Sequence, residues 1–331
     1  MARQVMIIGA GKQMMKDHVP VVLNTPDCEI VSVVEPDPKS LQHAAETIGC
    51  PVFASLEDAL SYIKPDIAIV SVPHNQYWPI LEILATNHIA TLKEKPLSMN
   101  EEEGSQIVDL FARNNTYLQI CVQRRFSDLY KISKELVERL GEVYSIYAEY
   151  NLDLLSLDKK ALRWRSDKSI AGGGATLDLG YHTIDLLTYL LGMPDKVYAQ
   201  LNYNSLPGDY TIDDSMKAMC TYRRGKINAN LVVTLIYRSR GEVVKVFGRE
   251  GYVSVENRGV SLHDRHHNLI ETHSFSSKEH EVKNQFNYFL KKVDKRVSLG
   301  EQDILQDQLK NMRIIDAIYK SDSNNEIVRF I

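Results

Sequence analysis

The chain has 331 residues, of which 44% are hydrophobic and 25% are charged, and its formal net charge is −4. This length accommodates roughly two domains of ordinary size, the composition is that of a globular protein, and the charge argues against nucleic-acid binding. The four cysteines stand far apart without a C-x-x-C pair, so we expect reduced thiols in a cytoplasmic protein. No apolar run has the length of a membrane span or the features of a signal peptide, so we expect no membrane partner.

The first third of the chain alternates short apolar runs with amphipathic segments. Apolar strands that alternate with helices are typical of a parallel sheet covered by helices on both faces. The sequence therefore predicts a doubly wound α/β domain over residues 1–122. Its expected strands lie within 4–11, 29–37, 65–73, 89–96 and 117–126, and its expected helices within 18–25 (with Pro20 in an early turn), 38–49, 57–63, 76–87 and 100–115.

Residues 123–331 show a different pattern, in which several segments alternate polar with apolar residues between tight turns. This pattern is typical of an antiparallel sheet with one exposed face, so we predict a second domain of the α+β class. Helices are expected at 172–192 and 299–321. The second of them could pack back on the first domain. The expected strands lie at 142–153, 196–205, 215–224, 226–237, 242–251, 252–264, 268–276 and 326–331.

The stretch GAGKQM follows the first expected strand and opens a helix. Gly9 permits a tight turn and Gly11 permits a pyrophosphate to approach the backbone, as in a dinucleotide-binding loop, although Met14 occupies the third glycine position. A plain strand-to-helix turn is the alternative. Glu35 favours the nucleotide site, because it ends the second strand about 20 residues later, where an acid binds the ribose hydroxyls of NAD. Its charge would repel the 2′-phosphate of NADP, but the nearby Lys39 keeps NADP open as the alternative.

Lys95 directly follows an expected strand, in the sequence KEKPLS. The carboxyl ends of parallel strands form the edge where ligands bind in open α/β sheets. Pro96 restricts the backbone of the lysine before it, so the ammonium group is expected to point in a defined direction. A solvated loop lysine is the alternative.

Asp178, His182 and Asp185 recur at i, i+4 and i+7 of the helix expected over 172–192, which places them on one face. An imidazole can take the hydroxyl proton of an alcohol near neutral pH, and a nearby lysine would stabilise the developing alkoxide. The three glycines before this helix would let a ligand approach closely. Asp185 is expected to pair with protein groups rather than substrate. The alternative is a capping or ion-paired Asp178 and a structural His182.

Together these motifs resemble the Gfo/Idh/MocA oxidoreductase family. The resemblance is carried, in chain order, by GAGKQM, VVEPD, EKP, QRRF, WRSD and GGGATLDLGYHTID. It implies a Rossmann domain, a second domain built on a large open, mostly antiparallel sheet, bound NAD or NADP, and a sugar, nucleotide-sugar or cyclitol substrate. Matched residue by residue, it implies catalytic roles for Lys95, Asp178 and His182, and a lining role for Trp164 and Arg165.

The expected site extends beyond these residues. Tyr77 stands where the family pattern after Pro73 has a histidine, and its hydroxyl can still hydrogen-bond. No metal is expected, because His263, His266 and His267 lack matching cysteines or carboxylates. Arg124, Arg125, Arg163 and Arg165 could bind a substrate anion or form structural ion pairs. The expected cofactor contacts are Gly9, Gly11, Lys12, Gln13, Met14, Glu35, Ser71, Pro73, Tyr77, Glu94, Lys95, Trp164 and Arg165, and the expected substrate contacts are Lys95, Arg165, Asp178 and His182.

We therefore expect an NAD-dependent dehydrogenase in which His182 is the base, Lys95 polarises the hydroxyl and Asp178 anchors the substrate. One alternative is hydrolysis or elimination by transient oxidation, in which the cofactor is regenerated in each turnover. A second alternative is a non-catalytic dinucleotide-binding regulator, although retention of all three residues argues against it. The exposed face of the second sheet is expected to mediate a homodimer or homotetramer.

Overall fold

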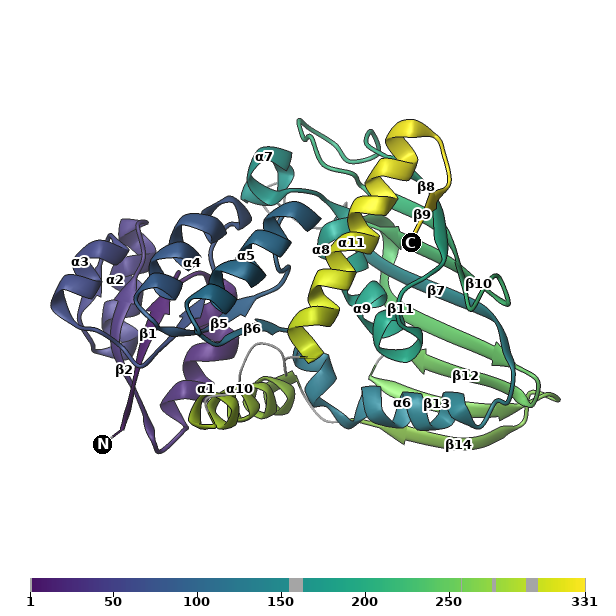
Figure 1. The fold of residues 1–331 in the computed structure, drawn as a ribbon, viewed down its shortest axis with the longest axis horizontal. Helices are drawn as coiled ribbons and strands as arrows, with labels where there is room; N and C mark the ends of the chain where they lie inside the picture. Colours follow the sequence, from purple (N-terminus) through teal and green to yellow (C-terminus); the bar gives the residue numbers. More distant parts are fainter. Residues whose placement is uncertain (1, 155–162, 257, 276–277, 296–302, 331) are drawn as a thin grey trace. The chain divides into compact units, whose positions relative to one another are not determined.

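The computed structural model describes residues 2–154, 163–256, 258–275, 278–295 and 303–330. These residues form two compact units, shown in Figure 1. Within the described ranges, no helix is long and apolar enough to cross a membrane. The first unit draws on Met1–Ser98, Glu102–Phe126 and Ser277–Gln306, and the second on Met99–Glu101, Ser127–Ser276 and Asp307–Ile331.

A parallel sheet forms the centre of the first unit (Figure 1). In the part of the chain described, its six strands have the order β3-β2-β1-β4-β5-β6, so the direction of winding reverses between β1 and β4. The predicted doubly wound domain is thus confirmed, and only the two-residue β3 was missed, because two residues show no periodicity. The strands are β1 (Arg3–Ile8), β2 (Cys28–Val34), β3 (Val52–Phe53), β4 (Ile67–Val70), β5 (Ala90–Glu94) and β6 (Leu118–Cys121).

Helices cover both faces of this sheet because successive side chains of a strand point to opposite sides. Val5 and Ile7 of β1 lie in a core formed with α1 and α10, whereas Met6 and Ile8 lie in a core formed with α3 and α4. The helices of the first unit are α1 (Val19–Leu23), α2 (Pro38–Ile48), α3 (Leu56–Tyr62), α4 (Tyr77–Thr86), α5 (Glu101–Arg113) and α10 (Lys278–Asp294).

A π-helical segment, Met14–His18, precedes α1 and extends the first helix back to the glycine loop. The predicted helix began later, at residue 18, because Pro20 is favoured in a first turn. Pro20 instead lies inside a continuous helical stretch. Pro20 has no N–H group to donate to the preceding turn, and the wider π-helical turns end just before it. The helical stretch as a whole starts at residue 12, directly after Gly11.

Helix α10 belongs to the first unit, whereas the sequence predicts a second domain over residues 123–331 and no helix in this segment. Val282, Phe286, Phe289 and Leu290 are buried in the core shared with α1 and β1. Their spacing is that of an amphipathic helix, but the charged residues around them hide it. The domain boundary therefore has to be corrected, since the first unit takes back a segment that follows the second sheet in sequence.

A large sheet forms the second unit, with nine strands in the described ranges, in the order β14-β13-β12-β11-β7-β10-β9-β8-β15. Only the β7–β10 pairing among these is parallel, which confirms a mostly antiparallel sheet. Buried and exposed side chains alternate along β9 and β10, so one face is covered and the other is open. The strands are β7 (Val143–Asp153), β8 (Lys196–Asn202), β9 (Ser215–Tyr222), β10 (Ile227–Thr234), β11 (Ile236–Gly248), β12 (Gly251–Glu256), β13 (Gly259–Asp264), β14 (Leu269–Ser274) and β15 (Val328–Arg329).

Helices of the second unit pack against this sheet, with α6 on β12 and β13, α8 on β9 and β10, and α9 on β7 (Figure 1). Helix α6 was not predicted, and the run 252–264, expected as one strand, forms the separate strands β12 and β13. The start of the expected C-terminal helix, 299–302, lies outside the described residues. The helices are α6 (Asp128–Glu138), α7 (Lys168–Ala171), α8 (Ala175–Asp178), α9 (Gly180–Leu191) and α11 (Asp303–Asn324).

The packing of α10 allows a prediction about the free energy of unfolding. Phe289 is fully buried between α10, α1 and β1, so Phe289→Ala should lower the free energy of unfolding by about 3–5 kcal/mol. Guanidinium denaturation measures this change. Ile270→Ala removes a side chain that is 54% exposed and should cost less than about 0.5 kcal/mol; similar losses in the two variants would contradict this packing.

Candidate active site

The glycine loop after β1 has the local geometry of a dinucleotide-binding turn. Gly9 has a φ of 86°, and a Cβ atom there would lie 2.2 Å from the Ser71 carbonyl oxygen, so only glycine fits. At Gly11, by contrast, a Cβ atom would meet no described atom within 4 Å, which leaves the backbone open to a ligand. Met14 fills the third glycine position with a fully buried side chain, so only its backbone could reach a cofactor.

Glu35 lies against this loop at the end of β2. Its carboxylate accepts hydrogen bonds from the backbone N–H groups of Ala10, at 2.7 Å, and Asp37, at 2.9 Å. Each carboxylate oxygen retains acceptor capacity for a ribose hydroxyl. The nearby Asp37 caps α2 by accepting from the Ser40 N–H at 2.9 Å, so its carboxylate has a structural role.

The residues after β4 add an acceptor that the sequence analysis overlooked. Asn75 lies in the short 3₁₀-helix His74–Gln76, and its buried Oδ1 atom has no hydrogen-bond partner among the described residues. A buried polar atom without a partner is costly, so a bound group that donates a hydrogen bond would satisfy it. The open position at Gly11, the carboxylate of Glu35 and this orphaned oxygen all fit a dinucleotide. The signal was available, since Asn75 follows a strand whose carboxyl end faces the switch point.

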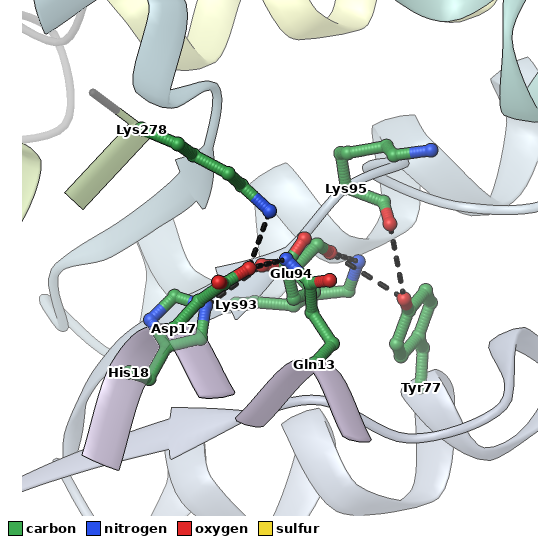
Figure 2. A network of polar contacts seen from close by, with 8 residues as sticks. All are labelled: Gln13, Asp17, His18, Tyr77, Lys93, Glu94, Lys95 and Lys278. Atoms are coloured by element: carbon green, nitrogen blue, oxygen red, sulfur yellow. Dashed lines mark hydrogen bonds and ion pairs between the residues drawn. The ribbon is translucent and has the colours of Figure 1, made fainter. Parts of the chain in front are cut away.

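Several charged side chains lie around the segment after β5 (Figure 2). The Lys95–Pro96 peptide is cis, and the Lys95 side chain extends away from the side chains of Lys93 and Glu94. His18 Nε2 lies 2.7 Å from Glu94 Oε1. Burial raises the pKa of Glu94, but the hydrogen bond from His18 and the charges of His18, Lys95 and Lys278 outweigh it, so the pKa lies below its usual value.

A second contact in Figure 2 connects the start of α10 with the first helix. Lys278 pairs with Asp17, which also accepts from Gln13 Nε2 at 2.6 Å. The side chain of Gln13, an expected cofactor contact, is therefore engaged by the protein. Lys12, the other polar residue of the loop, is exposed.

One group of described residues has the ligand types of a metal site. Potential ligand atoms of His18, Glu94 and Cys121 lie within 4.8 Å of one another. Lys95 and Lys278 contribute positive charge at Glu94, and burial holds the pKa of the Cys121 thiol well above its usual value. Both effects disfavour a divalent cation, which needs deprotonated ligands.

The other expected catalytic residues lie in the second unit, on two helical segments instead of one. Asp178 ends α8 and His182 lies in the first turn of α9, and both are half-exposed. Arg165 Nε lies 3.7 Å from Asp178 Oδ2, and the guanidinium group stacks 4.3 Å from the Trp164 ring centroid. The Tyr150 and His182 rings lie 6.2 Å apart. The unit therefore brings Trp164, Arg165 and Asp178 together.

Asp185, unlike the half-exposed Asp178 and His182, is buried. It is only 2% exposed and accepts hydrogen bonds from Tyr130 Oη at 3.1 Å, Gln308 Nε2 at 3.0 Å and Asn311 Nδ2 at 2.8 Å. The expectation that Asp185 pairs with protein groups is confirmed. Its three neutral donors come from α6 and α11, so the acid fastens α9 to its neighbours.

The three glycines before α8 leave no room for a ligand. The interpretation that they let a ligand approach closely is therefore wrong. Cβ atoms at Gly173 and Gly174 would lie 2.1 Å from Tyr319 Oη and 2.0 Å from the Asp213 carbonyl oxygen. The space is filled by the protein itself. The buried Asp213 carboxylate accepts from the N–H groups of Gly174 and Thr176 and from Tyr319 Oη, each at 2.7 Å. This carboxylate fixes the turn that leads into α8 and Asp178.

The remaining histidine and arginine candidates give weaker signals. His263 stacks on Tyr252 with centroids 4.5 Å apart and hydrogen-bonds Ser261, and the turn between β13 and β14 holds His266 and His267. The side chain of Arg163 lies outside the described residues.

Two family models match the chain. The model described as "Oxidoreductase family, NAD-binding Rossmann fold" matches residues 3–121, and the model "GFO/IDH/MocA C-terminal domain" matches residues 131–254. D-glucoside 3-dehydrogenase of Escherichia coli is 26% identical over 251 residues, which cover 68% of this chain and 68% of that enzyme.

Solved structures share the fold over nearly the whole chain. Levoglucosan dehydrogenase in complex with NADH and levoglucosan has a TM-score of 0.88 at 20% identity, covering 99% of both chains. The WlbA dehydrogenase from Bordetella pertussis in complex with NADH and UDP-GlcNAcA has a TM-score of 0.85 at 20% identity, covering 100% of this chain and 99% of that one. These likenesses establish the two-domain fold.

The turn before α8 generates a testable expectation. In Asp213→Asn, one carboxylate oxygen becomes an NH₂ group that faces an N–H donor, so unfolding free energy should fall by about 2–4 kcal/mol. Thermal and urea denaturation measure the loss. Asp209→Asn, at an exposed position in the same loop, should stay within about 0.5 kcal/mol of the parent. Equal stability of the two variants would show that Asp213 does not hold the turn.

Proposed function

The chain belongs to the Gfo/Idh/MocA oxidoreductase family, whose Rossmann domain binds NAD, and on this premise we propose that it oxidises or reduces a secondary hydroxyl carbon of a sugar, nucleotide sugar or cyclitol. The observation that carries the proposal is the loop and acid of the first unit, where Gly11 is open and Glu35 lies against the turn. The names of related proteins support a carbohydrate substrate, since they act on D-glucosides and levoglucosan.

The chain offers a group for each proton and charge in this reaction. Bound NAD would take the hydride from the carbinol carbon. His182 would accept the hydroxyl proton, since imidazole is a base near neutral pH. The Lys95 ammonium would stabilise negative charge on the same oxygen, and Asp178 would hold a neighbouring hydroxyl.

Further features support narrower proposals. On the open sheet face, the exposed side chains of Tyr147 and Met219 lie in one cross-strand row through Asn230, and apolar side chains on an open sheet favour association. We propose a homodimer or homotetramer through this face. The four cysteines form no disulfide, which supports a cytoplasmic location.

The base assignment predicts a specific kinetic loss. His182→Ala should lower the turnover rate about 10²–10⁴-fold, the usual contribution of a positioned base, while the dissociation constant for NADH stays nearly unchanged. The assay follows NADH formation at 340 nm across a panel of sugars, nucleotide sugars and inositols. Turnover at the parent rate would remove His182 from the mechanism. Product formation with only catalytic NAD and no net NADH would favour hydrolysis or elimination by transient oxidation.

Cofactor choice has its own test. Glu35→Ala should weaken NAD binding about 10–100-fold, the value of a charge-assisted hydrogen bond lost from a ribose. NADP should lose much less, because the substitution also removes the charge that repels its 2′-phosphate. Titration calorimetry with both cofactors measures the ratio, and Glu57→Ala, an exposed glutamate on α3, is the control. Equal losses for NAD and NADP would contradict the preference for NAD.

A further inference from the structure

Lys93 is a fully buried lysine that has no role in the reaction as proposed. It is the fourth residue of β5, its exposed fraction is 0%, and burial lowers the pKa of its amine well below the usual value. Lysines are almost never fully buried, because removing an ammonium from water is costly unless its donors are satisfied. An apolar side chain would fill the same space at a lower cost of desolvation. The contacts of Lys93 therefore indicate what the amine does.

The Lys93 amine holds the backbone on both sides of Lys95. Its Nζ atom donates to the Glu94 carbonyl oxygen at 2.9 Å and to the Pro96 carbonyl oxygen. It also lies 3.2 Å from the centroid of the Tyr77 ring, where an N–H group can face the aromatic ring. Two carbonyl groups and one aromatic ring therefore surround the amine.

Tyr77 completes the same arrangement from α4. It is 1% exposed, and its Oη atom lies 3.4 Å from the carbonyl oxygens of both Glu94 and Lys95. Figure 2 shows Lys93 and Tyr77 together beneath the Lys95 segment, with the Lys95 side chain extending away from them. Between them, the two side chains contact each of the three successive carbonyl groups from residue 94 to residue 96.

We infer that Lys93 and Tyr77 are positioning residues, which act on the substrate only through Lys95 by fixing the backbone that carries it. The inference rests on the proposed function, in which the Lys95 ammonium contacts the reacting oxygen. An ammonium on a long side chain stabilises an alkoxide only if its backbone holds it in place, since displacement by about 1 Å can cost as much as 10²-fold in rate. A buried amine is suited to this task because its donors have no competing water.

A double-mutant cycle tests the inference. Lys93→Met keeps the length of the side chain but removes its donors, and should lower kcat/KM about 10–100-fold with little change in NADH affinity. Lys95→Ala should cost more. If Lys93 acts through Lys95, then Lys93→Met in the Lys95→Ala background should cost less than about threefold, because the group that it positions is already gone. A loss equal to the product of the two single losses would overturn the inference.

Two further variants keep the test decisive. Thr91→Val, on the same strand and equally buried, removes a polar group that contacts the Ile89 carbonyl oxygen instead of the loop, and should leave kcat/KM unchanged. Tyr77→Phe removes only a hydroxyl and should lower kcat/KM about 3–10-fold, again without effect in Lys95→Ala. It carries the cycle if Lys93→Met does not fold.

The failures of the two proposals are distinguishable. If Lys95→Ala turns over at the parent rate, then the proposed role of Lys95 is wrong, and the positioning role is wrong with it. If Lys95→Ala is slow but Lys93→Met and Tyr77→Phe both keep the parent rate, only the positioning role is overturned.

Discussion

The parallel pairing of the first sheet is the constraint on which the candidate cofactor site depends. Because all strands run in one direction, the loops after β1, β2, β4 and β5 leave the sheet at the same edge. These four loops carry Gly9, Glu35, Asn75 and Lys95. The hydrogen bond from the Ala10 N–H to Glu35 shows that residues 25 positions apart meet there. No single loop is a site by itself, and the order of the strands assembles them.

Buried polar groups then fix the local geometry on each unit. In the first unit Lys93 contacts carbonyl groups around Lys95, and in the second Asp213 accepts from N–H groups before Asp178. Lys93 donates to carbonyl groups and Asp213 accepts from N–H groups, and each satisfies backbone groups that a turn leaves unpaired. A buried polar group is tolerated only with such partners. Each buried group thus fixes the backbone beside a half-exposed residue, Lys95 in the first unit and Asp178 in the second.

The sequence predicted most of the fold because its periodicities are strong where elements are long. The alternation of polar and apolar residues along β9 and β10 predicts a sheet with one open face. The continuous apolar runs predict the parallel strands. Helix α10 was missed because its buried positions, such as Phe286, are spaced among charges, and its membership of the first unit depends on contacts distant in sequence. At the site, Gly9, Glu35 and Lys95 could be found by motif and position. Lys93 could not be found, since a lysine in a strand gives no sign of which carbonyl groups it will meet.

The glycines before α8 show why a residue type can mislead about function. A glycine is required wherever another group approaches the backbone closely, and the sequence cannot tell a ligand from the protein's own atoms. At Gly11 the space beside the backbone is open, whereas at Gly173 and Gly174 Tyr319 and Asp213 occupy it. The same absence of a Cβ atom therefore accompanies open space at Gly11 in the first unit and permits close internal packing at Gly173 and Gly174 in the second. The two cases differ only in whether residues distant in sequence, here Tyr319 and Asp213, approach the glycine backbone.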